Sequence, residues 1–312
     1  MSIATPVWTE IEAPRSLRRT LGVHRTGFGD PTTRIADGRF TRATLTPDGP
    51  GTLRLRWTAD PALPADCGLD AEAWGPGADW LLARVDDLAA GRDRAGEFAG
   101  AHPVVERSLR LTRGGRFSAS GTLYHQLLPT IIAQRITGGE AVRQWSRLCY
   151  RLGETPPGPT EVVGTMRLPP APETLHRRPA WWFHPMGIET KRARALTEIA
   201  RHADALWRWT EAGGETVAAK LALLPGVGAW TIGSVLGPVL GDPDAVAIGD
   251  YHHPNTVAWA LAREARGDDD RMLELLEPYR GQRGRVLWAL TSIAGGAPKF
   301  GPRRRILPMA RW

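Results

Sequence analysis

The chain has 312 residues, and 40 Lys and Arg against 33 Asp and Glu give a formal net charge of +7 at pH 7 and a pI of about 10.1. This length is enough for two domains with separate cores, and the charge suits a polyanionic partner such as nucleic acid. Only three of the basic residues are lysines, so an arginine-biased composition explains the charge equally well. No segment approaches the roughly 18 apolar residues of a membrane span, and residues 1–16 lack the features of a secretion signal. With two widely separated cysteines, Cys67 and Cys149, this predicts a cytoplasmic protein without a disulfide framework.

The N-terminal third is predicted to mix strands and helix. Residues 40–57 alternate between apolar and polar on both sides of a Pro-Asp-Gly-Pro-Gly turn, which predicts a β-hairpin. The apolar residues expected on one face of this hairpin are Ala43, Leu45, Leu53, Leu55 and Trp57. Asp79 is the expected N-cap of a helix over residues 80–90 that ends at Gly91. We therefore place a mixed strand and helix domain at residues 1–112.

After residue 112 the apolar spacing becomes helical. One stripe covers residues 123–132, and a second covers residues 141–152 and ends at Gly153. Residues 154–173 carry six prolines, which predicts an irregular strap. A further helix is expected within residues 186–207. Its predicted buried stripe is Ala195, Ile199, Ala203 and Leu206, and its predicted exposed first turn holds Lys191, Arg192 and Arg194.

A tight turn between two helices is predicted at Pro225. The apolar helical run over residues 218–224 stops there, and a second helix is expected to begin near Ala229. Between them, Gly226 and Gly228 allow positive φ and close backbone approach. The turn would present the unpaired N–H groups of the second helix outward, a geometry that binds phosphate.

Asp250 follows the apolar run of residues 246–248 and directly precedes another predicted helix. An Asp at this position caps the helix by accepting backbone N–H groups, and the positive helix end favours its charged form. We therefore expect a carboxylate at neutral pH. Its role is either helix capping alone or capping combined with chemistry.

The Leu-Pro-Gly-Val-Gly motif at residues 224–228, with Asp250 placed 22 positions after Gly228, resembles the helix-hairpin-helix (HhH-GPD) DNA glycosylase superfamily. The most similar branch is the AlkA-type DNA-3-methyladenine glycosylase II, and the resemblance covers about residues 118–293. It implies an α+β protein with an N-terminal antiparallel-sheet domain and an all-helical core of two lobes. These occupy residues 1–112 and 113–296, and a basic tail follows at 297–312. The resemblance further implies a monomeric, nucleoid-associated protein that binds double-stranded DNA containing damaged bases.

The resemblance also assigns roles to particular residues. Asp250 matches the catalytic carboxylate, which stabilises positive charge on the deoxyribose and orients the attacking water. The base pocket would be formed by Trp230, Trp288 and Tyr251. The hairpin residues that would contact the DNA backbone are Pro225, Gly226, Val227, Gly228 and Thr231. The residues that match the segment wedged into the duplex are Gln134, Arg135 and Ile136.

The resemblance limits the cofactors and the reaction. Relatives that also cut the strand carry a Schiff-base lysine at the position of Trp230, so water is the expected nucleophile and no AP-lyase activity is expected. Two cysteines cannot hold the four-cysteine iron–sulfur cluster of other branches. The hairpin of relatives commonly holds a monovalent cation, which predicts Na⁺ or K⁺ at the backbone of Leu223, Gly226 and Gly228. No other cofactor is expected.

The resemblance thus predicts a monofunctional base-excision glycosylase for alkylated purines of the 3-methyladenine and 7-methylguanine type. These bases are cationic, and a tryptophan face attracts a cation by ~0.5–2 kcal/mol. Ser234 stands where relatives have a second pocket aromatic, so another damaged or mismatched base is an alternative substrate. A helix-hairpin-helix protein that binds DNA without chemistry is a second alternative, but such a protein has no need of Asp250. His252 and His253 could contact phosphate or simply be exposed.

Overall fold

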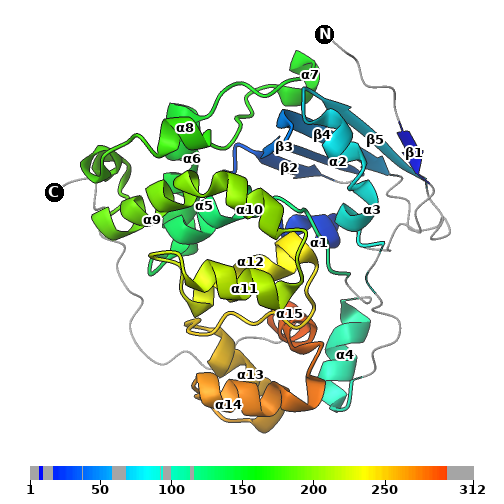
Figure 1. Ribbon diagram of the computed structural model, residues 1–312. Coiled ribbons are helices and arrows are strands. Elements are labelled where there is room, and N and C mark those ends of the chain that lie inside the picture. Colours follow the sequence, from blue (N-terminus) through cyan, green and yellow to red (C-terminus); the bar gives the residue numbers. More distant parts are fainter. Residues whose placement is uncertain are drawn as a thin grey trace.

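The computed structural model describes residues 7–9, 17–36, 38–57, 68–91, 93, 100–112 and 116–293. An antiparallel sheet formed by the N-terminal part lies beside one group of helices, and a second group lies at the opposite end of the molecule from the sheet (Figure 1). Among these residues no helix is both long and apolar enough to cross a membrane. Cys149 is buried as a free thiol, while Cys67 and the predicted basic tail at 297–312 lie outside the described residues.

The sheet has five strands in the order β1-β5-β4-β3-β2, with every neighbouring pair antiparallel. This confirms the predicted N-terminal sheet. The strands are β1 Val7–Thr9, β2 Thr33–Ala36, β3 Arg39–Thr46, β4 Gly49–Trp57 and β5 Leu69–Trp74.

The predicted hairpin is formed by β3 and β4, but its register differs from the expected one. Thr46 pairs with Gly49, so the turn contains two residues instead of five, and Ala43 pairs with Thr52. Because side chains alternate between the two faces of a sheet, Ala43 lies on the face opposite Leu53. The single apolar face predicted for Ala43, Leu45, Leu53, Leu55 and Trp57 is therefore wrong.

Both faces of this hairpin are covered. Leu53 and Leu55 pack in a core with three short helices, which are α1 Leu17–Gly22, α2 Ala78–Leu82 and α3 Val85–Leu88. On the other face, Ala43 packs against Met166 and Leu168 of the proline-rich strap. The strap is thus held by the sheet, which explains why an irregular segment has buried residues.

The helix predicted over residues 80–90 is broken into α2 and α3, with Gly77 and not Asp79 at the N-cap of α2. The chain leaves helical geometry at Arg84, where φ is −108° and ψ is 9°. The guanidinium of Arg84 lies 3.8 Å from the ring centroid of Trp80 and donates to Glu211 at 2.8 Å. The single helix expected from the local pattern is thus interrupted at a residue that contacts a distant segment.

The first helical lobe shares one large apolar core. Its helices are α5 Leu123–Ala133, α6 Gly138–Leu152, α9 Thr190–Arg201, α10 Ala203–Trp209, α11 Gly214–Ala222 and α12 Ala229–Leu240. The strap between α6 and α9 contains only the short elements α7 Thr160–Val163, α8 Pro172–Leu175 and η2 Ala180–Met186. The helices predicted at 123–132 and 141–152 and the irregular strap are therefore confirmed.

The buried stripe predicted for residues 186–207 is confirmed, although the helix breaks at His202 between α9 and α10. Arg192, predicted to be exposed, is only 1% exposed. Its guanidinium donates to the carbonyl of Ile132 at 2.6 Å and to Gln144 Oε1 at 2.9 Å. These acceptors compensate the buried charge, and none of them is visible in the local sequence.

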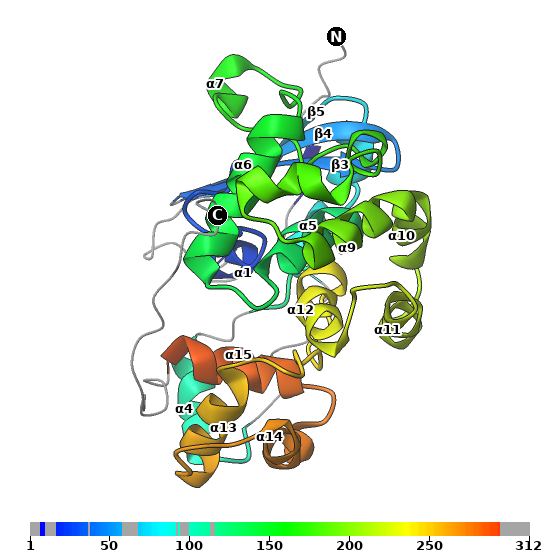
Figure 2. The same cartoon turned by 90° about the vertical axis from the view of Figure 1, so that its left-hand side faces the viewer.

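The second helical lobe contains four helices and a short 3₁₀ element. These are α4 Pro103–Leu111, α13 His253–Ala262, α14 Asp269–Leu276, η3 Glu277–Tyr279 and α15 Arg283–Ile293. Val105 of α4 shares a core with Val257 of α13 and Leu290 of α15. A helix from the N-terminal side of residue 112 therefore packs on the C-terminal lobe, as both views show (Figures 1 and 2). The two predicted lobes are present, while the domain limits at 112 and 296 stay a prediction.

A buried polar network joins the sheet to the first lobe. The carboxylate of Asp30 accepts the indole N–H of Trp145 at 3.0 Å. The ring of His125 lies between the hydroxyl groups of Thr32 and Thr44, at 3.1 and 2.8 Å. Partners on both sides satisfy these buried groups, so the network fixes how the sheet sits on α5 and α6.

Two buried histidines, His125 of this network and His24, whose Nε2 lies 2.6 Å from the hydroxyl of Ser118, make stability depend on pH. His24 and His125 are fully buried, and burial, together with the nearby charge of Arg42, lowers the pKa of both below the ordinary 6.5. The folded state therefore binds fewer protons than the unfolded chain. The resulting stabilisation is complete above pH 6.5 and is lost as the pH falls below it.

We expect the free energy of unfolding, measured by urea titration, to fall between about pH 7.5 and 5.5. Each histidine contributes up to about 1.4 kcal/mol per pH unit below its unfolded pKa. His125→Gln should reduce this pH dependence, while the same change at exposed His184 should leave it intact. Equal pH dependence in both variants would contradict the assignment.

Candidate active site

The predicted tight turn connects α11 to α12, and its two glycines differ in conformation. Gly226 has a φ of +87°, and a Cβ built there would lie 2.6 Å from the Cβ of Ala195 in α9. Gly228, the N-cap of α12, has a φ of −107°, and a Cβ there would meet nothing within 4 Å. Of the two glycines, Gly226 uses the positive φ that glycine allows, and Gly228 does not. Gly228 therefore leaves an open approach to the first turn of α12.

The three residues predicted as a duplex wedge have different environments. The side-chain amide of Gln134 donates to the carbonyl of Gly226 and to the hydroxyl of Thr231, both at 2.9 Å. Ile136 is partly buried against the core of the first lobe. Arg135 is exposed and has a φ of +60°, a conformation that non-glycine residues rarely adopt. Gln134 thus fastens this segment to the turn, and Arg135 is the member that extends into solvent.

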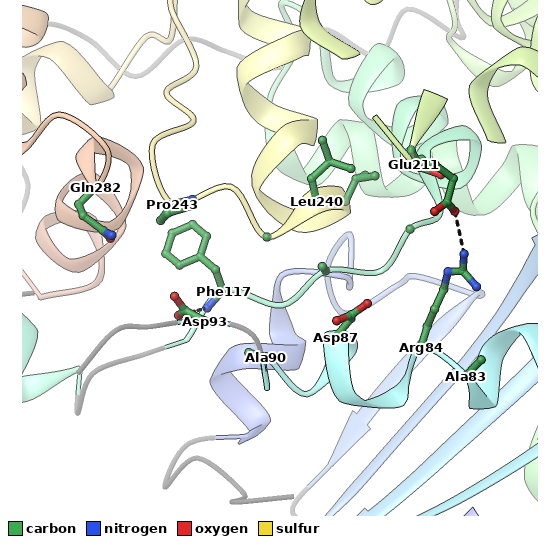
Figure 3. Close-up of a pocket in the computed structure, with 15 residues that line it drawn as sticks. Ala83, Arg84, Asp87, Ala90, Asp93, Phe117, Glu211, Leu240, Pro243 and Gln282 are labelled. Atoms are coloured by element: carbon green, nitrogen blue, oxygen red, sulfur yellow. Dashed lines mark hydrogen bonds and ion pairs between the residues drawn. The ribbon is translucent and has the colours of Figure 1, made fainter. Parts of the chain in front are cut away.

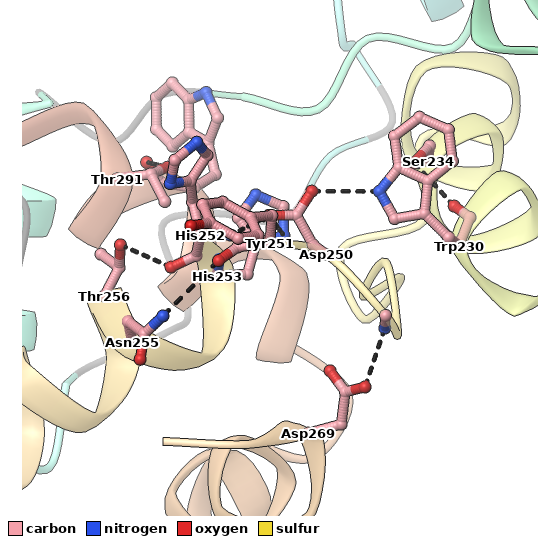
Figure 4. Close-up of polar contacts among 12 residues, drawn as sticks. Trp230, Ser234, Asp250, Tyr251, His252, His253, Asn255, Thr256, Asp269 and Thr291 are labelled. Carbon is pink, nitrogen blue, oxygen red and sulfur yellow. Dashed lines mark hydrogen bonds and ion pairs between the residues drawn. The ribbon is translucent and has the colours of Figure 1, made fainter. Parts of the chain in front are cut away.

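Asp250 lies in the connection between α12 and α13, where the chain passes from the first lobe to the second. Its Oδ1 accepts the backbone N–H groups of His252 at 2.8 Å and of His253 at 3.0 Å. Its Oδ2 accepts the indole N–H of Trp230 at 3.0 Å (Figure 4). The predicted capping contacts are present, although His252 is the N-cap residue of α13.

These donors keep Asp250 ionised. Burial acts to raise the pKa of Asp250, but the hydrogen bond from Trp230 and those from the backbone of His252 and His253 outweigh it. The pKa therefore lies below the ordinary 3.8. With its side chain 19% exposed, Asp250 is a charged carboxylate that water and a ligand can still reach.

Two glycines bring the backbone before Asp250 close to its neighbours. A Cβ on Gly233 of α12 would lie 2.1 Å from the carbonyl oxygen of Val246, and a Cβ on Gly284 of α15 would lie 2.4 Å from that of Ala245. The segment is therefore enclosed between α12 and α15. A glycine within an apolar helix is a sequence signal of close backbone approach, and Gly233 is the position that sequence reasoning missed.

A second missed residue supports the turn that precedes Asp250. Asp269, in the first turn of α14, accepts the backbone N–H of Gly249 at 3.0 Å (Figure 4). Gly249 itself has a φ of +87°. The turn is thus held from the second lobe, and nothing in the run Asp268–Asp269–Asp270 singles out the residue that makes this contact.

The residues next to Asp250 are mostly open to solvent. Tyr251 is 84% exposed, and its ring meets that of His252 edge to face at 4.9 Å between centroids. His253 Nδ1 lies 3.7 Å from Asp250 Oδ1. Burial lowers the pKa of His253 and outweighs the attraction of Asp250, so His253 is neutral at neutral pH. These positions leave Tyr251 and His252 free to meet a ligand.

Trp288 of α15 is not joined to Asp250 by any contact in the described part of the chain. Its ring meets Phe117 edge to face at 6.4 Å between centroids. Ser234, in place of an aromatic, donates its hydroxyl to the carbonyl of Trp230 at 2.7 Å. The roles of Trp288 and Tyr251 as pocket walls stay predictions.

The three carbonyls predicted to bind a monovalent cation are not equally available. That of Gly226 accepts Gln134, and that of Gly228 accepts the N–H of Ile232 at 3.0 Å within α12. The carbonyls of Gly226 and Gly228 thus already accept hydrogen bonds, so together with that of Leu223 they are poorly suited to coordinate a cation. No cluster of His, Cys, Asp or Glu suited to a metal occurs among the described residues. The cation stays a prediction, and no step of the chemistry depends on it.

A cavity of about 600 Å³ lies elsewhere, at the C-terminal end of α12 (Figure 3). It is about 15 Å along the helix from Trp230, since an α-helix rises about 1.5 Å per residue. Its charged lining comprises Asp87, Asp93 and Glu211, with Arg84. Net negative charge does not suit a phosphate chain, so the candidate site is defined by Asp250 and not by this cavity.

Gly233→Ala should separate α12 from the segment that carries Asp250. The added methyl group would meet the backbone at Val246, which cannot rotate away as a side chain does. We expect a lower melting temperature and loss of the Trp230–Asp250 hydrogen bond. Calorimetry measures the melting temperature, and the indole N–H signal of Trp230 in NMR spectra reports the hydrogen bond. Gly213→Ala, where a Cβ meets nothing within 4 Å, is the control. A Gly233→Ala protein with unchanged stability and signal would disprove the close approach.

No family model and no curated protein matches the sequence. Solved structures do match it. A 3-methyladenine DNA glycosylase from Archaeoglobus fulgidus superposes with a TM-score of 0.71 at 16% identity, over 91% of this chain and 96% of that one. An 8-oxoguanine glycosylase/lyase from Clostridium acetobutylicum gives 0.67 at 11% identity, over 94% and 100%.

A third match covers less of this chain. The 3-methyladenine DNA glycosylase Mag1 of Schizosaccharomyces pombe, in complex with abasic DNA, gives a TM-score of 0.50 at 15% identity, over 62% of this chain and 94% of that one. The two longer matches include the sheet as well as both lobes. The chain therefore has the fold of the helix-hairpin-helix DNA glycosylases, with an N-terminal antiparallel sheet followed by a helical region.

Proposed function

We propose that the protein is a monofunctional DNA glycosylase that hydrolyses the N-glycosidic bond of alkylated purines flipped out of double-stranded DNA. The observation that carries this proposal is the carboxylate of Asp250. It is charged, partly exposed, and fixed by three hydrogen-bond donors beside the first turn of α12.

The proposed chemistry uses the charge of Asp250. As the base leaves, positive charge develops on the deoxyribose, and a fixed carboxylate beside it lowers the energy of that state. Water then adds to the sugar, and Asp250 can orient this water and accept its proton. A carboxylate has about four lone-pair positions, of which three accept the donors already described, so one remains for the water or the sugar.

The proposed DNA grip uses the turn between α11 and α12. The first N–H groups of α12 have no acceptor within the helix, and the open space at Gly228 lets a phosphate approach them. Arg135, fastened to the turn through its neighbour Gln134, is our choice for the residue that enters the space left by the flipped base. A long side chain with a fixed backbone suits this role.

Hydrolysis without strand cleavage is proposed because residue 230 is a tryptophan and not an amine. The two lysines within the described residues lie elsewhere: Lys191 in the first turn of α9, and Lys220 in α11 with its ammonium 5.7 Å from the ring of Trp209. The fold alone does not select the substrate, since its relatives include 3-methyladenine and 8-oxoguanine glycosylases. The electron-rich ring of Trp230 supports a cationic alkylpurine.

Base release from duplexes that carry 7-methylguanine, 3-methyladenine, hypoxanthine or 8-oxoguanine tests this function. We expect release of the cationic bases with the strand intact until alkali is added, and no complex trapped by borohydride. Asp250→Asn should lower the single-turnover rate by roughly 100- to 1,000-fold while DNA affinity changes little, because charge is lost from beside the sugar.

The alternatives give distinct results in the same assay. Preferred release of 8-oxoguanine would show that this base, and not an alkylated purine, is the substrate. A trapped covalent complex would show that an amine, and not water, is the nucleophile. If no lesion is released while duplex binding persists, the protein is a DNA-binding module. An Asp250→Asn protein with normal rates would remove Asp250 from the mechanism.

Gly228→Val should weaken binding to all duplexes by roughly tenfold or more, whatever the lesion, because phosphate contacts carry no sequence information. Gly213→Val is a matched control, since Gly213 is also a glycine N-cap with open space, at the start of α11. Fluorescence anisotropy with damaged and undamaged duplexes measures the affinities. Equal effects of the two substitutions would argue against contact at the turn.

A further inference from the structure

The hydrogen bond between Trp230 and Asp250 joins two parts of the chain. Trp230 belongs to the first turn of α12, and Asp250 lies 20 residues later, beyond the end of that helix. The other two donors to Asp250 are backbone groups of the turn that follows it. Among the described residues, Trp230 therefore supplies the one hydrogen bond that holds this carboxylate from the first lobe.

We propose that Trp230 is a positioning residue for Asp250: its indole N–H fixes the plane of the carboxylate and directs the remaining lone pair of Oδ2 toward the reacting sugar and water. This inference rests on the proposed glycosylase function. It gives Trp230 a task beyond that of an aromatic wall for the base.

The carboxylate needs a third anchor because its own torsion is weakly restrained. Rotation of a carboxyl group about its bond to Cβ has broad, roughly twofold minima. The N–H groups of His252 and His253 both bind Oδ1, so they hold one oxygen and leave the other free to swing. A donor on Oδ2 from a different helix removes this freedom. Near-attack geometry depends on such restraint.

Trp230 is itself well restrained. Its carbonyl accepts Ser234 in the next turn of the helix, and its neighbour Thr231 is 1% exposed and accepts Gln134. The close approach at Gly233 sets the distance between α12 and the segment that ends at Asp250. The backbone at Trp230 is therefore fixed relative to the segment that carries Asp250, which brings the indole N–H within 3.0 Å of Oδ2.

The charged and titratable groups around Asp250 do not replace this contact. His253 is neutral at neutral pH because burial lowers its pKa, and its Nδ1 lies 3.7 Å from Oδ1, beyond hydrogen-bond distance. The ring of His252 is exposed and packs against Tyr251, while Asp269 on α14 binds the N–H of Gly249. Of these groups, the indole of Trp230 alone donates to Oδ2, while the backbone N–H groups of His252 and His253 donate to Oδ1.

The two roles of Trp230 are compatible because they use different parts of the ring. An indole N–H lies in the ring plane, at its edge, and Figure 4 shows this edge directed at Asp250. In the proposed function it is a face of the ring that meets a cationic base. Replacing Trp230 by Phe therefore removes the hydrogen bond and keeps an aromatic face.

Trp230→Phe should lower the single-turnover rate of base release by roughly 10- to 100-fold, the range expected for one hydrogen bond to a charged group. DNA affinity should change less than about twofold. The pKa of Asp250, followed by the ¹³C signal of its carboxyl group, should rise because the indole no longer offsets burial. Trp207→Phe is the control, since the buried indole N–H of Trp207 meets no acceptor in the described part of the chain.

The titration needs no lesion, so it separates this proposal from the proposed function. An unchanged Asp250 pKa in Trp230→Phe overturns the positioning role, whichever base the enzyme releases. A normal release rate in Trp230→Phe, with Asp250→Asn inactive, also overturns it and leaves the glycosylase intact. If Trp230→Phe fails to fold, the indole ¹H–¹⁵N signal of Trp230 in the unmodified protein decides. The chemical shift of this signal should change as Asp250 titrates and should differ in Asp250→Asn. If the chemical shift does neither, the contact is refuted.

Discussion

The partly buried negative charge of Asp250 is the constraint that the rest of the structure satisfies. Removing a carboxylate from water is unfavourable, and the protein compensates with three N–H donors that leave the group ionised. Two donors come from the turn before α13 and the third from α12. Since α12 and α13 belong to different lobes, the compensation is complete only when the lobes are assembled. The site is therefore a product of packing and not of one local motif.

Helix α12 links every part of the candidate site. Its first turn presents the open space at Gly228, the indole of Trp230 and the hydroxyl of Thr231, which accepts Gln134 from the segment before α6. One turn further, Gly233 admits the backbone that leads to Asp250. A rigid helix thus sets the spacing between the turn, the segment with Arg135 and the carboxylate. Precise relative placement follows because one rigid helix carries Trp230, Thr231 and Gly233.

The sequence predicted those features that depend on local chemistry. The Pro-Gly-Val-Gly turn, the capping Asp250 and the strands of the hairpin are specified by residues within a few positions of one another. The errors had different origins. The hairpin register follows from a turn of two residues where five were expected. The expected helix at 80–90 is interrupted at Arg84, which contacts the distant Glu211, and Arg192 is buried because it meets carbonyl and amide acceptors far along the chain. Gly233 carried a usable signal, but its partner, the backbone at Val246, could not be identified before the fold was known.

The side chain at residue 230 determines how much of the negative charge of Asp250 is neutralised by its neighbour. A lysine at this position would bring a positive charge next to Asp250 and would neutralise much of its field. The indole of Trp230 instead donates a hydrogen bond without carrying charge, so it fixes the carboxylate and leaves its full negative charge available. In the proposed reaction, a transition state with positive charge on the sugar would be stabilised by this partly buried negative charge. Under the same proposal the neutral ring offers an electron-rich face to a cationic base, so one side chain would favour both the charged substrate and the charged transition state.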